Sequence, residues 1–503
     1  MAQFDKIYTR LDRIFTESEI NDILGSVLNK TLGDIDKNNV FEKTIKHPKI
    51  TGIAGDVIEE SVLEYPSDNK QEADIIVDGV DTEVKTTGIR IKEHKNTANH
   101  YEAKEPMTIT AVSPENIVYE DFLSSMFWHK LKHMLLVYYL YDSKTTVPAS
   151  GYANFPVKGY ELHQFNEDEQ EILEKDWKIV KNFIHSIQED NIKPNDGYPR
   201  ISSELRPHLM MIDTSPKWPN RPRFRLKRAA VSTIVQQYFG RKFEQLEDSI
   251  TSFSELEERL RHFSVLYKGK SVKELLHIFD IPAKLTSKDD VSKNVTEQIV
   301  TSMFGAKSKK MSSIELFSEI GLISKTITIT SKGYRTEDTK LQTIDFTEWK
   351  DEKINFEDSS IYEYFGQNQF LFIIFEEQNR NDKLLDNKFL GFKRLSFSDE
   401  FIEQEVKRTW DDTRDLLMNN KLEETVIRYN TGPNKGQPKI NKNGLTSTSI
   451  NFPKSKDYPV FLRGTGSDSS DKTETVNGIS IYRQNFWIKG KWITQKLLEL
   501  DYI

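Results

Sequence analysis

Two carboxylates and one lysine within residues 73–87, ADIIVDGVDTEVKTT, have the types and spacing for metal-assisted chemistry. The central Asp-Gly pair between two β-branched runs predicts a two-residue hairpin turn. In that register Asp74 lies directly opposite Glu83, and Lys85 shares their face because side chains alternate along a strand. Facing carboxylates repel each other, so this pair favours a divalent cation such as Mg²⁺ between its oxygens. The cation would activate a water, while Lys85 would orient that water and offset charge on a phosphate.

A helix upstream of the hairpin can supply a third carboxylate. Residues 52–63, GIAGDVIEESVL, have the apolar spacing of a helix, with Val57, Ile58 and Val62 on its buried face and Glu59 at the edge of that face. A carboxylate from a helix, then Asp, then Glu-x-Lys is the order found in PD-(D/E)XK nucleases. The alternative is an exposed edge hairpin that carries ordinary surface charges.

The ordered set of motifs resembles the MutH family. Residues 29–35 (NKTLGDI), the helical segment 55–59 and the Asp74…Glu83-x-Lys85 set carry this resemblance. With its length, the chain is most similar to the Sau-three-A-I-like group of type II restriction endonucleases, which cut at GATC. The resemblance covers most of the chain, because that group also has a C-terminal MutH-like domain.

The resemblance implies a role for each acidic and basic residue of the set. It assigns three metal ligands and one catalytic lysine: Glu59, Asp74 and Glu83, and Lys85. Lys130, in the segment Phe-Trp-His-Lys, resembles a second active-site lysine, and the alternative is a cation on a helix surface. Two more residues separate Asp74 from Glu83 than in MutH itself, which leaves Asp81 as a substitute ligand.

Two basic stretches are candidates for DNA contact. Residues 217–228 hold six cations and no acid, and residues 428–442 hold four cations and no acid. Arginines interleaved with aromatics favour a nucleic-acid surface, whereas a solvated loop is the alternative. Residues 212–217 and 222–227 resemble MutH strands that face the DNA, although Ser215 stands where the family has an arginine. We therefore expect DNA contacts from basic side chains in both halves of the chain: Lys217, Arg223, Arg225, Lys227, Arg428, Lys435 and Arg483.

The chain also resembles itself at an offset of about 240 residues. Three short segments repeat in order, the last of which places Ile323-Ser-Lys325 against Glu83-Val-Lys85. In the second copy Ile314 stands in place of Asp74, and Gly366 aligns near Lys130. Because apolar side chains cannot coordinate Mg²⁺, we expect the second copy to bind DNA and regulate cleavage without a metal site. A purely structural partner domain is the alternative.

The expected fold is α/β, with two MutH-like domains that each have a mixed central sheet flanked by helices and with the acidic hairpin at the edge of its sheet. A chain of 503 residues is too long for one ordinary core. The predicted parts are a catalytic domain at 1–235, a connector at 236–258 and a degenerate domain at 259–503. Ser254, followed by Glu257 and Glu258, predicts the start of a capped helix in or after the connector.

Composition excludes several kinds of site. The absence of cysteine excludes disulfides, thiolate zinc sites and cysteine nucleophiles. The net charge of −8 argues mildly against nucleic acid, but the two clustered basic stretches weaken that argument. The longest apolar run, 134–141, is too short to span a bilayer, and the first residues lack a signal peptide, so we expect an intracellular protein.

The function implied by the resemblance is that of a Mg²⁺-dependent type II restriction endonuclease. It would cut double-stranded DNA at GATC, 5′ to the G, by attack of a metal-activated water. The alternatives are a strand-nicking endonuclease of the mismatch-repair kind and a DNA-binding protein without catalysis. One active site per chain predicts two chains assembling on DNA, or one chain cutting twice. The expected setting is the bacterial cytoplasm, with a cognate DNA methyltransferase as functional partner.

Overall fold

The computed structural model describes residues 6–67, 72–92, 100–216, 218–334, 337–379, 382–441, 444–466 and 469–503. The chain divides into two compact units. Unit 1 comprises Met1–Ser143, Val147–Arg259 and Glu297–Ile323, and unit 2 comprises Lys144–Thr146, Leu260–Thr296 and Ser324–Ile503. Lys217, one of the predicted DNA contacts, lies outside the described residues.

Unit 1 is built on a mixed six-stranded sheet. Its strands follow the order β1 (Ile14–Phe15), β2 (Ile75–Val77), β3 (Val80–Lys92), β6 (Met134–Leu140) and β7 (Val157–His163), with β4 (His100–Ala103) paired to β3. The pairs β1–β2 and β3–β6 are parallel, and the other pairs are antiparallel. This confirms the predicted mixed sheet flanked by helices. The expectation that the acidic hairpin forms the edge is wrong, because β1 pairs with β2 beyond it.

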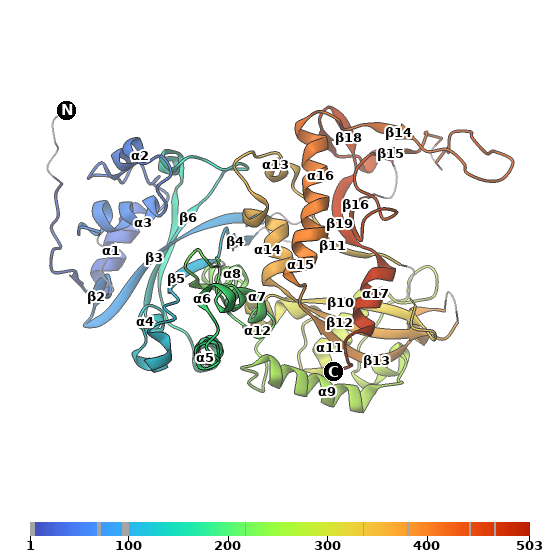
Figure 1. Ribbon diagram of the computed structural model, residues 1–503, viewed down its shortest axis with the longest axis horizontal. Helices are drawn as coiled ribbons and strands as arrows, with labels where there is room; N and C mark the ends of the chain where they lie inside the picture. The colour runs from blue at the N-terminus through green and yellow to red at the C-terminus, as the bar shows by residue number, and fades with distance from the viewer. Residues whose placement is uncertain are drawn as a thin grey trace. The chain divides into compact units, whose positions relative to one another are not determined.

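Helices cover both faces of this sheet. Figure 1 shows α1 (Glu17–Val27) and α3 (Ile53–Val57) on one side of β3 and β6, and α5 (Glu167–Glu189) and α8 (Arg228–Tyr238) on the other. The strand β6 is buried almost throughout, as expected for a central strand covered on both faces. Capping boxes begin two of these helices, through Thr16 and Glu19 at α1 and through Asn166 and Glu169 at α5.

A second, three-stranded sheet completes unit 1. It has the order β5 (Met107–Ala111), β9 (Arg223–Leu226), β8 (Ile212–Asp213). The buried carboxylate of Asp176 on α5 anchors β8, because it accepts backbone N–H groups from Met210, Met211 and Ile212 at 2.8 to 3.1 Å. The remaining helices of the unit are short: α2 (Lys43–Lys46), α4 (Met126–His129), α6 (Pro194–Gly197), α7 (Arg200–Glu204), α11 (Asn294–Met303) and α12 (Glu315–Glu319).

Unit 2 repeats this order of elements. One sheet has the order β10 (Leu322–Thr330), β12 (Gln369–Glu377), β13 (Lys388–Leu395), and the other β11 (Thr339–Thr343), β19 (Arg483–Ile488), β16 (Val460–Thr465). Helix α14 (Ser360–Gln367) precedes β12 as α4 precedes β6, α15 (Asp399–Phe401) and α16 (Lys407–Met418) follow β13 as α5 follows β7, and α17 (Gly490–Leu498) follows β19 as α8 follows β9. The other elements are α10 (Val272–Ile278), α13 (Phe346–Trp349), β17 (Glu474–Val476) and β18 (Ile479–Ile481).

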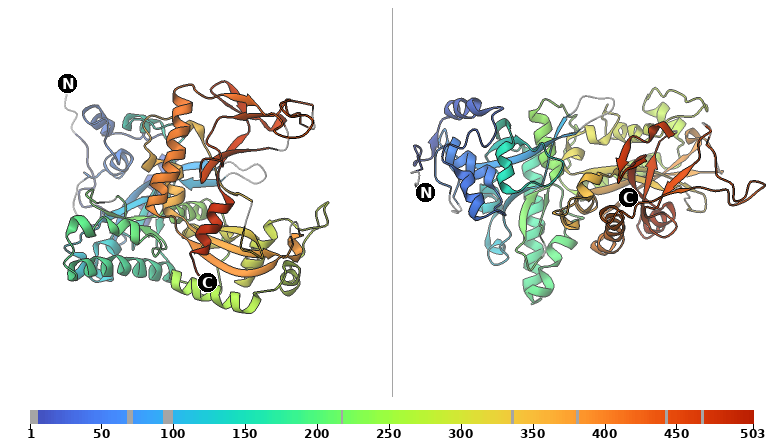
Figure 2. Two further views of the ribbon diagram at one scale, coloured as in Figure 1. Left: turned by 45° about the vertical axis from the view of Figure 1, so that its right-hand side comes forward. Right: turned by 90° about the horizontal axis from the view of Figure 1, so that it is seen from above.

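The strands β14 (Glu424–Val426) and β15 (Thr448–Ile450) form an exposed hairpin of unit 2. Figures 1 and 2 show the segment between them, in orange-red, reaching away from the rest of that unit. Nearly every described residue of 423–441 is exposed. This segment contains the predicted DNA contacts Arg428 and Lys435.

The predicted helix after the connector is present as α9 (Phe253–Tyr267), but its cap differs from the prediction. The hydroxyl of Ser252, not that of Ser254, accepts the N–H of Glu255 at 3.2 Å, and Glu255 reaches back to the N–H of Thr251 at 2.7 Å. Ser254 lies within the first turn, where its hydroxyl is too late in the chain to cap the helix. No helix among the residues described has the length and apolar composition needed to cross a membrane.

Candidate active site

The acidic hairpin has the register that its sequence predicts. Ile75 pairs with Thr82, Ile76 with Asp81 and Val77 with Val80, and these pairings place the next residue, Asp74, at the level of Glu83. Both turn residues have positive φ, 47° for Asp78 and 80° for Gly79, as a type I′ turn requires. Asp74 Oδ2 accepts the N–H of Val84 at 2.9 Å, which ties its carboxylate to the strand that carries Glu83.

Two lysines hold the Glu83 carboxylate. Lys85 Nζ donates to Glu83 Oε1 at 2.7 Å, and Lys130 Nζ donates to both oxygens at 2.8 and 2.9 Å. Lys130 follows α4 and precedes β6, which pairs in parallel with β3 and so brings this lysine to Glu83. The Glu83 side chain is 4% exposed, and charged hydrogen bonds in such a site are stronger than at a surface. The structure therefore places Lys130 in the acidic site rather than on a helix surface.

Glu59 lies on the helix that packs against the hairpin strand. The helix α3 continues into a π-turn, Ile58–Val62, that carries Glu59. Glu59 Oε1 and Thr86 Oγ1 would lie 3.9 and 3.5 Å from a Cβ at Gly55, so the carboxylate reaches the face of α3 that meets β3. Burial, then the charges of Asp74 and Asp56, raises the pKa of Glu59 to about 8. Burial and the Glu83 charge likewise raise the pKa of Asp74 to about 6.

The neighbouring residue Glu60 has the opposite environment. Its carboxylate accepts hydrogen bonds from Lys43 at 2.6 Å, from Ser67 at 2.7 Å and from Lys6. Burial opposes its ionisation, but these hydrogen bonds lower the pKa of Glu60 to about 2. Consecutive carboxylates on one turn therefore serve different purposes, since Glu60 is a satisfied structural ion and Glu59 lacks a comparable cationic partner.

The donor set suits a hard divalent cation. Glu59, Asp74 and Glu83 supply carboxylate oxygens, the ligands that Mg²⁺ prefers, while Lys85 and Lys130 supply only two positive charges against three negative ones. Burial first, and the neighbouring acids second, raise the pKa values of Glu59 and Asp74, and both values would fall when a cation binds. The three carboxylates therefore supply the ligand types of the predicted metal centre, although in this structure their oxygens do not all lie within 4.8 Å of one another.

Tyr65 is a member of this site that the sequence reasoning missed. Its side chain is 1% exposed, and among the residues described no hydrogen-bond partner reaches its hydroxyl. Burial, then the charges of Glu59 and Asp74, raises its pKa, so the hydroxyl keeps its proton. A buried hydroxyl without a partner costs free energy unless a water or ligand meets it. No sequence motif marks Tyr65, which is distinguished only by following the segment Ile58–Val62 by three residues.

Asp81, the predicted substitute ligand, lies apart from the three acids. Its side chain is 49% exposed, and its carboxylate lies 4.0 Å from His129 Nε2. Glu83 is among the largest causes of the raised pKa of both Glu59 and Asp74, and Asp81 is not. The geometry therefore favours Asp74 over Asp81 as a ligand.

The predicted DNA contacts divide by exposure. Arg223 on β9 is exposed, and Arg225 is held by two hydrogen bonds from its guanidinium to Asp213 at 2.8 and 3.0 Å. Lys227 is only 1% exposed, and its Nζ donates to the carbonyl of Leu209 at 2.6 Å. Because it is buried, Lys227 has no access to DNA in this structure, and the expectation for this residue is corrected. In unit 2, Arg428, Lys435 and Arg483 are all exposed.

The second copy lacks an equivalent acidic site. Ile323 lies on β10 where Glu83 lies on β3, and Lys325 Nζ donates to the carbonyl of Lys340 at 3.0 Å. Ile314 is fully buried, and Gly366 ends a helix where unit 1 has Lys130. At the places of Asp74 and Glu83, the described side chains Ile314 and Ile323 therefore offer no oxygen ligand.

Comparison with known proteins agrees with this geometry. Residues 63–176 match the family described as the DNA mismatch repair enzyme MutH, a segment that contains Asp74, Glu83, Lys85 and Lys130. The chain is also 23% identical over 475 residues to the type II restriction enzyme Sau3AI of Staphylococcus aureus, which covers 86% of this chain and 90% of that protein. The acidic hairpin thus lies inside the segment that matches the MutH family, in a chain that is similar to a type II restriction enzyme along most of its length.

Proposed function

We propose that the chain is a Mg²⁺-dependent type II restriction endonuclease that hydrolyses double-stranded DNA at GATC, 5′ to the G. The observation that carries this proposal is the Glu83 carboxylate held by both Lys85 and Lys130 beside Asp74 and Glu59. The similarity to a type II restriction enzyme along most of the chain supports the restriction role, and the GATC site is what the resemblance of the sequence motifs implies.

Each residue of the site has a defined task in phosphodiester hydrolysis. Glu59, Asp74 and Glu83 would hold Mg²⁺, which when bound lowers the pKa of water and polarises the phosphate. The ammonium of Lys85 orients the attacking water and offsets the negative charge that develops on phosphorus. Lys130 holds the second side of Glu83 and fixes its direction, because it bonds both of its oxygens. The leaving 3′ oxygen takes its proton from solvent.

The proposed DNA surface uses the exposed basic side chains of both units. Arg223 and Arg225 lie on β9 of unit 1, and Arg428, Lys435 and Arg483 lie in unit 2. Lysine and arginine paired with guanine edges are the expected base contacts. We propose that the segment 259–503 is a degenerate MutH-like domain that binds DNA and regulates the catalytic domain 1–235, with 236–258 as connector. The repeated order of elements supports this assignment.

The second candidate is a strand-nicking endonuclease, because the proposed active site around Glu83 occurs once in each chain. One site cuts one strand, so a double-strand break needs two chains on the DNA or two successive cuts. We propose a homodimer assembled on GATC, acting in a bacterial cytoplasm beside a cognate methyltransferase. Steady accumulation of nicked plasmid at a rate first order in enzyme would instead support the nicking enzyme.

Digestion of unmethylated plasmid tests the proposal. Wild type with Mg²⁺ should produce a discrete GATC fragment pattern, and both EDTA and Glu83→Ala should abolish it. End-sequencing of the fragments determines whether the cut lies 5′ to the G. DNA binding without cleavage by wild type would overturn the proposal in favour of a non-catalytic binding protein.

A further inference from the structure

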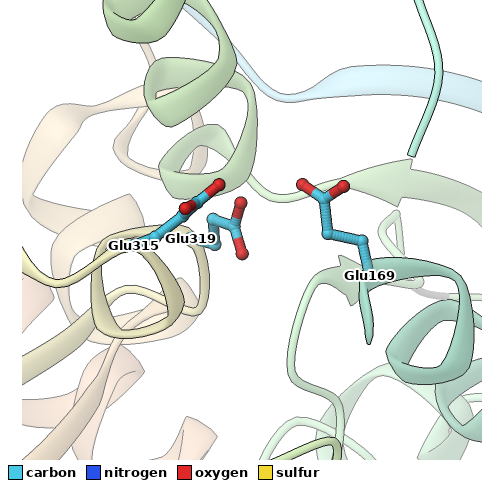
Figure 3. A group of neighbouring side chains, drawn as sticks. All are labelled: Glu169, Glu315 and Glu319. Carbon is cyan, nitrogen blue, oxygen red and sulfur yellow. The ribbon is translucent and has the colours of Figure 1, made fainter. Parts of the chain in front are cut away.

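A second group of three carboxylates lies in unit 1, outside the proposed active site. Glu169 is in the first turn of α5, and Glu315 and Glu319 lie at the two ends of the short helix α12. A spacing of four residues puts the latter two on one helix face. One oxygen from each carboxylate lies within 4.8 Å of the others, and among the residues described no other acidic group meets this criterion. Figure 3 shows the three carboxylates directed toward one another.

No cation in the described part of the chain balances this group. Glu169 is 6% exposed and Glu319 is 3% exposed. The charges that raise the pKa of Glu319 are those of Glu169 and Glu315, and the charges that raise the pKa of Glu169 are those of Glu315 and Asp168, all of them acids; a side-chain hydrogen bond joins Glu169 and Glu319. Three like charges at this distance in a buried place are strongly unfavourable without a counter-charge.

Glu319 provides an independent sign of a missing ligand. Its Oε1 is buried, and no hydrogen-bond donor of the described chain reaches it. A buried carboxylate oxygen without a partner costs free energy that a bound ligand would recover. In the view of Figure 3, the Glu319 carboxylate that carries this oxygen lies between the carboxylates of Glu315 and Glu169.

The surrounding donors keep the other two carboxylates oriented as anions. The backbone N–H of Asn166 donates to Glu169 Oε2 at 2.7 Å. Side-chain amides of Gln237 and Gln245 donate to the two oxygens of Glu315 at 2.7 and 3.1 Å. Each of the three oxygens that accept these bonds keeps a lone pair for a metal, because an ionised carboxylate has about four acceptor sites. Protonation would instead compete with these donors.

We propose that Glu169, Glu315 and Glu319 form a structural site for a calcium-sized divalent cation. Because the three atoms lie within 4.8 Å of one another, a point between them lies no more than about 2.8 Å from each. That limit admits the roughly 2.3–2.6 Å of calcium–oxygen bonds, and a set of protein carboxylates suits Ca²⁺ better than Mg²⁺, which usually keeps several waters. The cation would fasten α12 to α5, the helix whose Asp176 anchors the β8 strand.

Calcium binding to the full chain tests the proposal after the active site is disabled. Glu83→Ala removes a predicted ligand of the catalytic cation, so titration calorimetry with Ca²⁺ on this variant should show one bound ion per chain and a raised Tm. Adding Glu319→Gln should weaken the binding by about tenfold or more and abolish the rise in Tm. Adding Glu174→Gln, a change at a half-buried position of α5 that pairs with Lys178 outside this group, should leave both unchanged.

Two outcomes would overturn the site. One is the absence of Ca²⁺ binding by the Glu83→Ala chain, and the other is equal Ca²⁺ binding after Glu319→Gln. Glu315→Gln gives a second variant at a less buried position if circular dichroism shows that Glu319→Gln fails to fold. Mg²⁺-dependent cleavage in the Glu319→Gln chain with Glu83 intact separates this cation from the catalytic one, and we expect that cleavage to persist.

Discussion

The strand β3 of unit 1 and the strand β10 of unit 2 occupy the same place in the order of elements but carry different side chains. On β3, Glu83 is held by two lysines, whereas Ile323 stands at the equivalent place on β10, and Lys325 bonds a backbone carbonyl. Both units keep their central strands, since β6 and β12 are almost entirely buried. The difference shows that apolar burial maintains this fold and that the charged groups are not needed for it.

The largest expected effect is on the rate of DNA cleavage, where a change of the Glu83 carboxylate is compared with a change of its apolar counterpart, Ile323. Glu83→Gln keeps the shape but removes the negative charge that both lysines hold, so we expect single-turnover DNA cleavage to slow by about a thousandfold. Ile323→Val should change the rate by less than about twofold, because it touches no ligand. Equal losses in the two variants, measured at saturating Mg²⁺, would mean that the units do not differ in chemistry.

The two aligned lysines sharpen the comparison. Lys85→Ala should reduce the cleavage rate by about a hundredfold, since its ammonium contacts Glu83, and Lys130→Ala should have a smaller effect because it leaves Lys85 in place. Lys325→Ala should leave the rate within about twofold. The measurement is the plasmid-cleavage rate at matched DNA occupancy. A loss with Lys325→Ala as large as with Lys85→Ala would assign a catalytic role to unit 2.

Tyr65 tests whether the site recruits a water or ligand that the protein alone does not supply. Tyr65→Phe removes a buried hydroxyl without a protein partner, so metal-free stability should stay the same or rise by up to about 1 kcal/mol. The Mg²⁺ concentration for half-maximal cleavage should increase several-fold. Urea unfolding with EDTA and a Mg²⁺ titration of cleavage measure the two effects. Loss of metal-free stability would show that the hydroxyl is already satisfied.

The smallest expected effect is on the free energy of unfolding, which should depend on pH with opposite signs through the adjacent residues Glu59 and Glu60. Without metal, folding raises the pKa of Glu59 to about 8, so the folded chain holds more protons than the unfolded chain between its ordinary value of 4.5 and that value. The free energy of unfolding should therefore fall as pH rises through this window. Glu60, with a pKa of about 2, stabilises the fold above pH 4.5 and loses that contribution as pH falls toward 2.

Thermal unfolding of Glu59→Gln and Glu60→Gln between pH 4 and 8 with EDTA measures this contrast. Relative to wild type, Glu59→Gln should flatten the decline of Tm with pH, and Glu60→Gln should lower Tm most at the upper end. At saturating Mg²⁺, the slope of Tm against pH should be the same for wild type and for Glu59→Gln. Identical slopes for the two variants without metal would contradict the different environments of these carboxylates.

Local patterns predicted the hairpin well and the contacts across the fold poorly. The register followed from the Asp78-Gly79 turn and the alternation of side chains, both of which act within a few residues. The burial of Val57, Ile58 and Val62 followed from helical spacing. The cap of α9 was misplaced by two residues, since Ser252 and Ser254 are equally good capping types and only the backbone decides between them.

Long-range placement explains the remaining gaps. The burial of Lys227 depends on Leu209 and the packing of β8 and β9, and neither a basic stretch nor its composition reveals this. The group of Glu169, Glu315 and Glu319 joins residues some 150 positions apart, and no local motif marks it. Tyr65 resembles any core tyrosine until its hydroxyl is found beside Glu59 and Asp74.

The sequence by itself determined the hairpin, its facing carboxylates, the helix that carries Glu59 and the loss of the acids in the second copy. These depend on turn chemistry, side-chain periodicity and residue identity, which act over short distances along the chain. Only the tertiary structure decided that Lys130 reaches Glu83 across 47 residues, that the pKa of Glu59 is raised to about 8 while that of Glu60 is lowered to about 2, and that Lys227 is buried. The physical reason is that charge pairing and desolvation depend on which distant elements pack together.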